Sequence, residues 1–132
     1  MSRIKPVNPE SLPRPVGYSH GMLAEGRRIL HVAGQIGCDS AGALVSSDIE
    51  KQMEKALSNV MAVVETAGGT PASVTRLTIY VTDVLVYRAH LKAIGEAYRR
   101  VMGKHYPAMA VIEVKGLFDA GAKVELEATA VL

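Results

Sequence analysis

The segment His105-Tyr106-Pro107-Ala108-Met109-Ala110-Val111-Ile112-Glu113-Val114 decides how the second half of the chain folds. Pro107 fixes its own φ angle and biases the preceding residue toward extended geometry, so it ends any helix before it. Beyond Pro107 the side chains alternate, with Ala108, Ala110, Ile112 and Val114 on one side and Met109, Val111 and Glu113 on the other. This period of two predicts a half-buried strand.

A second segment with the same period closes the chain. In residues 124–131 the apolar set is Val124, Leu126, Ala128 and Ala130, and the acidic set is Glu125 and Glu127. Further strands are predicted over 18–24, 29–33 and 74–81, with a turn at Glu25-Gly26 between the first two. Residues 1–15 are predicted to form an extended coil, because they contain Pro6, Pro9, Pro13 and Pro15.

Two amphipathic helices are predicted between these strands. Ser47 and Glu50 have the spacing of a capping box, and the helix that follows should run to about Ala67. Its apolar residues recur at intervals of three and four, which gives one buried stripe. Gly68 and the glycine after it supply a left-handed cap. The second helix is predicted over 86–102 and ends at Gly103.

This order of elements predicts a single two-layer α+β domain over residues 1–132. We expect a mixed sheet of about six strands with both helices packed on one face. The other face would be partly apolar, because its predicted members include Thr78, Tyr80, Met109, Val111 and Val131 beside Arg76 and Glu113. No further element is available to cover that face, so the pattern indicates contact with another subunit.

Composition restricts the class of protein. The chain has 132 residues, a net charge of +2 and no apolar run near 18 residues, so neither a membrane span nor a nucleic-acid partner is expected from composition. The first residues lack a hydrophobic signal region. Cys38 is the single cysteine, which excludes an internal disulfide and fits a reducing compartment. A cytoplasmic protein is therefore expected.

Six segments carry a resemblance to a known family. They are VGYSHG at 16–21, HVAGQIG at 31–37, LTIYVTD at 77–83, AYRRVMGKHYP at 97–107, YPAMAVIEV at 106–114 and KVELEATAV at 123–131. In this order they resemble the RidA family, also called YjgF/YER057c/UK114, from about residue 14 to the end. The resemblance implies a chorismate-mutase-like fold, a homotrimer with a small-molecule cleft at each subunit interface, and hydrolysis of imines or enamines without a metal or organic cofactor.

The resemblance also implies a set of site residues. Glu125 matches the family glutamate that positions the attacking water, and Tyr18 matches a cleft tyrosine that orients substrate or water. The backbone at Gly34 and Gln35 would line the cleft, where glycine permits close approach. Ala33 stands where the family has a serine. From the residues alone, a solvent-facing strand residue is the favoured interpretation of Glu125, and the resemblance reverses this preference. At a subunit interface, burial would raise the pKa of Glu125.

Met109 is the main departure from the family. Members with imine chemistry carry an arginine after the Pro-Ala pair, and that arginine would bind a substrate carboxylate through two charge-assisted hydrogen bonds. Methionine is instead a flexible apolar side chain that fills gaps. We therefore expect a divergent member whose substrate is not a standard 2-imino acid. His105 or Lys104 could supply positive charge instead.

Other features of the sequence have simpler explanations. Cys38 could be a reactive thiol, but an inert loop cysteine is favoured because no base lies near it in sequence. The four histidines lack metal-ligand spacing. The second helix carries a basic stripe, defined as Arg88, Lys92, Arg99, Arg100 and Lys104, and some family members are described as endoribonucleases. A solvated helix face is favoured over RNA binding, since no aromatic residues interleave the charges. A trimeric binding protein without hydrolase activity is the alternative function.

Overall fold

The computed structural model describes residues 3–132, and every structural statement that follows refers to them. Along the chain the elements are β1 (Arg3–Val7), β2 (Gly21–Glu25), β3 (Ile29–Gln35), α1 (Ile49–Thr66), the 3-10 turn η1 (Pro71–Ser73), β4 (Val74–Val81), α2 (Val84–Ala89), α3 (Leu91–Met102), β5 (Ala108–Glu113) and β6 (Val124–Val131).

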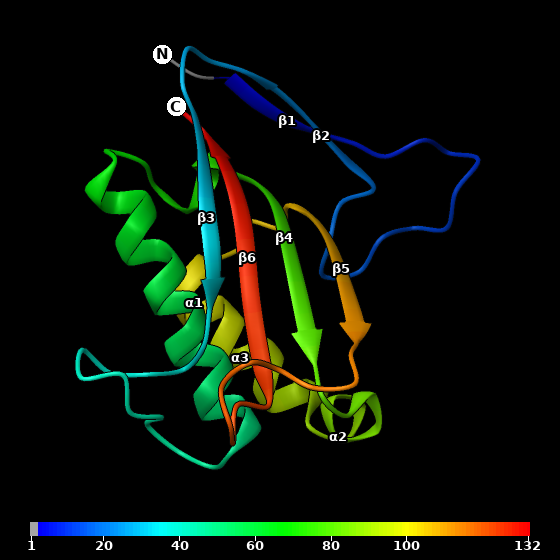
Figure 1. The fold of residues 1–132 in the computed structure, drawn as a ribbon. Coiled ribbons are helices and arrows are strands. Elements are labelled where there is room, and N and C mark those ends of the chain that lie inside the picture. Colours follow the sequence, from blue (N-terminus) through cyan, green and yellow to red (C-terminus); the bar gives the residue numbers. More distant parts are fainter. Residues whose placement is uncertain (1–2) are drawn as a thin grey trace.

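The main sheet has four strands in the order β3-β6-β4-β5 (Figure 1). β6 pairs antiparallel with β3 and β4, and β5 pairs parallel with β4. The connection between β4 and β5 is long enough to hold α2 and α3, as a parallel crossover requires. β1 and β2 form a separate antiparallel pair that extends beyond the main sheet. The fold is thus α+β with six strands, as predicted, but they are divided between two sheets.

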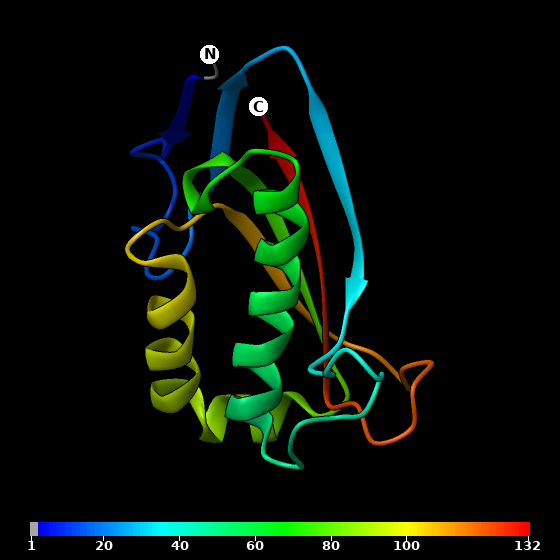
Figure 2. The same cartoon turned by 90° about the vertical axis from the view of Figure 1, so that its left-hand side faces the viewer.

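The long helices α1 and α3 pack side by side on one face of the main sheet (Figure 2). The alternating residues of β4 and β6 meet the apolar stripe of α1, so that Leu57, Leu77 and Leu126 are completely buried. This core is what the period of two in the strands and the spacing of three and four in α1 predict. None of the described helices is both long and apolar enough to cross a membrane.

The N-terminal third differs from the prediction. Residues 3–7 form β1 rather than coil, and Pro6 is tolerated because β1 is an edge strand whose only partner is β2. β2 begins at Gly21 rather than at Tyr18, and it pairs with β1 instead of forming a hairpin with β3. Between β2 and β3 the backbone N–H groups of Arg27 and Arg28 both donate to the carbonyl oxygen of Leu132.

Two helix predictions were wrong in detail. The N-cap of α1 is Asp48 rather than Ser47, and its side chain makes no capping hydrogen bond. The predicted second helix is divided at His90 into α2 and α3, and it starts earlier than expected because the Asp83 carboxylate accepts from two backbone N–H groups of its first turn. The helix ends are confirmed, with Gly68 at φ +92° after α1 and Gly103 at φ +64° after α3.

The orientation of β5 also differs from the prediction. Met109 pairs with Leu77 and Val111 with Ile79, both of which lie in the core, so these two β5 side chains face the helices and not the open face. The strand is apolar on both sides, and its alternation alone did not say which side would be covered. The open face is formed by His31, Arg76, Thr78, Tyr80, Ala108, Ala110, Ile112, Glu125, Glu127, Thr129 and Val131.

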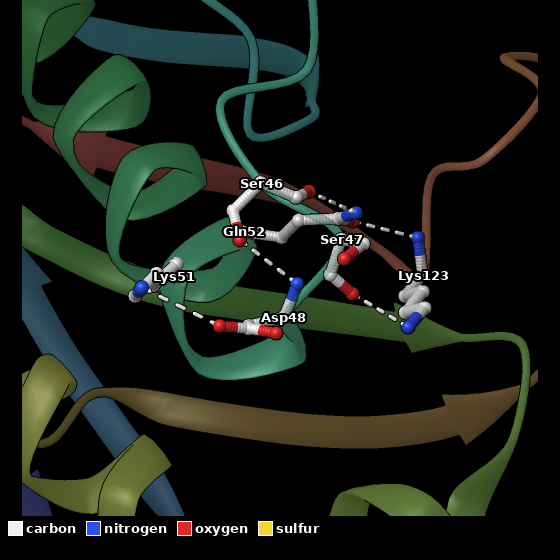
Figure 3. A network of polar contacts seen from close by, with 6 residues as sticks. All are labelled: Ser46, Ser47, Asp48, Lys51, Gln52 and Lys123. Atoms are coloured by element: carbon white, nitrogen blue, oxygen red, sulfur yellow. Dashed lines mark hydrogen bonds and ion pairs between the residues drawn. The ribbon is translucent and has the colours of Figure 1, made fainter.

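A polar network joins the start of α1 to the start of β6 (Figure 3). Gln52 is fully buried; its Nε2 donates to the carbonyl oxygens of Ser46 (2.9 Å) and Gly121 (3.1 Å). Its Oε1 accepts from the backbone N–H of Lys123 at 2.8 Å. Each hydrogen-bonding atom of the buried amide side chain therefore has a partner, and the network fixes the chain two residues before Glu125.

Candidate functional site

Glu125 lies against the backbone of Gly34 at the β3–β6 edge of the sheet. A Cβ atom at position 34 would come within 2.5 Å of Glu125 Oε2 and 2.9 Å of its Cδ, far closer than a real Cβ could approach. The register between β3 and β6 shifts between Val32 and Gln35, which leaves Ala33 and Gly34 opposite a single β6 residue. This is the pattern of a β-bulge. Glycine at position 34 thus provides the space that the Glu125 carboxylate occupies.

The turn that follows Gly34 is held by α1. Asn59 Nδ2 donates to the carbonyl oxygens of Ile36 and Cys38, each at 3.0 Å, and Gln35 Nε2 donates to Ala33 O at 3.1 Å. The Gln35 side chain therefore supports its own loop rather than extending away from it. Cys38 is half-buried in this turn. Asn59 was missed from the sequence, although an amide inside the apolar pattern of a helix was the signal for it.

The neighbouring glutamate on β6, Glu127, already accepts a hydrogen bond. Tyr80 Oη donates to Glu127 Oε1 at 2.7 Å, and this hydrogen bond raises the pKa of Tyr80. Glu125 lies opposite Tyr80 on the same face, yet its carboxylate makes no side-chain hydrogen bond or ion pair with residues 3–132. Of the two acidic residues, Glu125 is therefore the one available to a ligand or a water molecule.

Tyr18 and Met109 lie together at the opposite edge of the sheet. Ser19 forms a parallel bridge with Ala108; its backbone N–H donates to Pro107 O at 3.1 Å, and its Oγ donates to Tyr106 O at 2.7 Å. These bonds hold the segment before β2 against the free edge of β5. The Tyr18 ring contacts His20 edge to face, with ring centroids 5.2 Å apart. Tyr18 is therefore fixed beside β5 and not beside Glu125.

A pocket of about 500 Å³ opens between this edge and α3. It is mainly apolar and aromatic, and it is lined by Val16, Gly17, Tyr18, Met53, Ile79, Tyr87, Leu91, Ile94, Gly95, Tyr98, Arg99, Tyr106, Met109, Ala110 and Val111. This set is called the β5 pocket below. Its volume lies within the range of small-molecule sites.

The aromatic wall of the β5 pocket is held by ring stacking and a hydrogen bond. Tyr98 and Tyr106 stack with centroids 5.4 Å apart and ring planes 10° from parallel. Tyr98 Oη donates to His105 O at 2.6 Å, and burial raises the pKa of Tyr98, which keeps the phenol a neutral donor. The His105 ring is held by Val74 O at 2.7 Å and does not line the β5 pocket, so it is not placed to replace the missing arginine there.

The predicted site residues thus form two groups within one chain. Glu125, Gly34, Gln35 and Ala33 gather at β3 and β6, whereas Tyr18 and Met109 gather at β5. β6 and β4 separate the two edges, and Glu125 and Met109 point to opposite faces of the sheet. Within residues 3–132, no cluster of three or more His, Cys, Asp or Glu side chains could hold a metal ion.

Comparison with known proteins places these features in a family. Residues 10–132 match the family model described as endoribonuclease L-PSP. The chain is 32% identical to a RutC family protein of Pyrococcus horikoshii, over 92% of each chain. It is 31% identical to the 2-iminobutanoate/2-iminopropanoate deaminase of Salmonella typhimurium, over 96% of this chain and 97% of that protein.

One solved structure resembles this chain in both fold and sequence. The Rid family protein YyfB of Yersinia pestis, a protein of unknown function, is 34% identical and superposes with a TM-score of 0.88 over 98% of each chain. The match extends over both edges of the sheet, since it covers nearly all of the chain. The chain belongs to the RidA family, also called the Rid or YjgF/YER057c/UK114 family.

Proposed function

We propose that this protein hydrolyses a reactive imine or enamine to a carbonyl compound and ammonia. The observation that carries the proposal is the Glu125 carboxylate, which has no hydrogen-bond or ion-pair partner among residues 3–132 and lies against the side-chain-free backbone of Gly34. Relatives named 2-iminobutanoate/2-iminopropanoate deaminase, at about 30% identity, support the reaction class. No metal or organic cofactor is required, because an imine carbon is already electrophilic.

In this reaction Glu125 acts as a general base and then as a general acid. It orients a water molecule, whose oxygen adds to the carbon of the protonated imine while the C=N π electrons move to nitrogen and the carboxylate takes a proton from the water. The resulting neutral carbinolamine receives that proton on nitrogen. The C–N bond then breaks with its electrons on the departing ammonia, the C=O bond forms, and the hydroxyl proton passes to the Glu125 carboxylate, which releases it to ammonia or solvent. Backbone groups at Gly34 and Gln35 would line the site, and Tyr18 would orient substrate or water.

Within one chain, the residues at β3 and β6, which include Glu125, lie apart from Tyr18 and Met109 at β5. This separation supports a site to which two subunits contribute. We propose a cytoplasmic homotrimer in which Glu125 and Gly34 of one subunit meet Tyr18 and Met109 of the next. Apolar side chains at the β5 edge are exposed, including Val16, Val111 and Ile112, and a neighbouring subunit would cover them. Sedimentation should give about three times the chain mass of 14.1 kDa, and a mass near 14.1 kDa would contradict this site.

Gly34→Ala should reduce turnover without unfolding the protein. The new methyl group would need the space of the Glu125 carboxylate, which would have to move, and a displacement of about 1 Å can lower a rate roughly 10²-fold. Gly34 is not among the glycines with positive φ, so alanine is compatible with its backbone. Turnover and thermal unfolding should be measured together. Gly116→Ala is the matched control, since a Cβ there would meet no atom within 4 Å.

Met109 indicates that the substrate is not a standard 2-imino acid. An arginine at this place would make two hydrogen bonds to a carboxylate, worth about 1.5–3 kcal/mol each. Their loss lowers affinity for a small 2-imino acid by roughly a hundredfold or more. The Met109 side chain instead packs at the edge of the core beside Leu77, where it makes the pocket wall apolar.

The test is a panel of 2-imino acids generated by an amino acid oxidase and of imines without a carboxylate generated by an amine oxidase, with carbonyl release followed with and without the protein. We expect the wild type to favour imines with large apolar side chains. Met109→Arg should shift the preference toward small 2-imino acids by about tenfold or more, because it restores the charge-assisted bonds. If neither protein accelerates release from any member of the panel, the hydrolase function is wrong.

The alternative function is binding of a small molecule without hydrolysis. The apolar, aromatic lining of the β5 pocket would suit a trimeric protein that binds a small apolar molecule and does not hydrolyse it. Ligand binding by a protein that is inactive on the whole panel would favour this function. RNA binding has weaker support, because Arg100 of the basic stripe is paired with Glu54 on α1.

A further inference from the structure

The β5 pocket contains a cation at a place where the family resemblance does not put one. Among its lining residues, all of which lie in the described chain, Arg99 alone carries a charge. Arg99 comes from α3, on the wall across from β5, whereas the arginine that Met109 replaces would come from β5 itself. The pocket therefore has an anion-binding group, but on a different wall.

The Arg99 guanidinium is folded back along α3 over Gly95. A Cβ atom at Gly95 would lie 3.4 Å from Arg99 Nη1 and 4.0 Å from Nη2. Helical side chains lean toward the helix N-terminus, so position 95 is where the Arg99 side chain should pass. A Cβ atom at these distances would be in ordinary van der Waals contact with the guanidinium. The distances therefore place the guanidinium over Gly95, within the lining of the β5 pocket.

Arg99 is also free of competing partners within residues 3–132. The ion pairs there are Arg3–Glu25, Lys51–Asp48 and Arg100–Glu54, and Arg99 belongs to none of them. The adjacent Arg100 points across to α1, where its Nε donates to Glu54. Glu96 is the nearest carboxylate along α3, three residues before Arg99, and it makes no ion pair with it. The two consecutive arginines thus have different roles.

We propose that Arg99 binds the acidic group of an organic monoanion whose apolar or aromatic body fills the β5 pocket. The body would lie between the Tyr98–Tyr106 stack and Met109, and the acidic group would lie at α3, away from the β5 edge. The identity of the reacting group rests on the proposed function. If that function holds, the substrate is an imine whose acidic group is separated from the imine carbon by an apolar spacer. The binding itself can be measured separately.

The test compares a carboxylate with its neutral counterpart. Calorimetric titration of the full-length protein with 3-phenylpropanoate and with 3-phenylpropanamide should be carried out at low ionic strength, because Arg99 is exposed. The wild type should bind the acid about five- to thirtyfold more tightly than the amide. Arg99→Gln should abolish that difference and leave amide binding unchanged. Arg100→Gln, which removes the same charge one residue away, should behave as the wild type does.

Three results would overturn the proposal: absence of binding to either ligand, equal binding of acid and amide by the wild type, or an acid preference that survives in Arg99→Gln. A failure of the proposed hydrolase function would give a different set of results. If the wild type hydrolyses no imine but shows an Arg99-dependent preference for the acid, the hydrolase function is wrong and the anion site stands.

Discussion

Glu125→Gln is expected to lower the rate of imine hydrolysis by about 10²–10⁴-fold, the contribution typical of a positioned general acid–base group. Glutamine keeps the size of the side chain and can still lie against Gly34, but its amide cannot take a proton from water. Circular dichroism, thermal unfolding and subunit mass should stay at wild-type values. The effect should appear in kcat more than in KM, since the carboxylate acts on the water rather than on the bulk of the substrate.

Glu127→Gln is the matched control for this substitution. It removes the same charge from the same face of β6, but from a carboxylate that already accepts a hydrogen bond from Tyr80. Activity should change less than about tenfold, since neither the attacking water nor Gly34 is affected. If Glu127→Gln abolishes imine hydrolysis and Glu125→Gln does not, the roles of the two glutamates have been assigned the wrong way round.

Gln52→Leu is expected to lower the free energy of unfolding by roughly 3 kcal/mol, the largest stability effect we predict. The fully buried amide makes three hydrogen bonds, to Ser46 O, Gly121 O and Lys123 N. Leucine matches its volume but leaves those three backbone groups unpaired, at a cost of about 1–3 kcal/mol for each group that water cannot reach. Urea unfolding at one fixed protein concentration measures the change, since an oligomer's stability depends on concentration.

Lys51→Leu provides the comparison for Gln52→Leu. Lys51 is the preceding residue of α1, and its pairing with Asp48 is exposed to solvent. Such a surface pair contributes less than about 1 kcal/mol. Equal destabilisation by the two substitutions would mean that the buried network of Figure 3 contributes nothing specific.

Alternation predicted the strands of the core reliably where one face of a strand is buried and the other is not. β6 is the clearest case, because Val124, Leu126, Ala128 and Ala130 are all buried while the residues between them are more exposed. Alternation failed for the orientation of β5, where both sides are apolar and only the pairing of Met109 with Leu77 decides the buried face. It also could not reveal β1, whose stability comes from pairing with β2.

The candidate site was less accessible to reasoning from sequence. Positions 34 and 125 are far apart in the chain, and the contact between them depends on a register shift that has no sequence pattern of its own. The resemblance to the RidA family identified Gly34 and Glu125 as site residues, but it did not predict that they contact each other. Arg99 was assigned to a solvated stripe because helical periodicity describes faces and does not show that a side chain folds back over Gly95. Gln52 and Asn59 were missed because their partners are backbone groups of loops outside α1.

The contact between Gly34 and Glu125 also limits how this chain can change over evolutionary time. The two residues share one small volume, so a side chain gained at position 34 requires that the side chain at position 125 move away or become shorter. Substitutions at the two positions are therefore not independent, and their effects on fitness would not add. A lineage that has lost the carboxylate is released from the requirement for glycine, while one that keeps it is not.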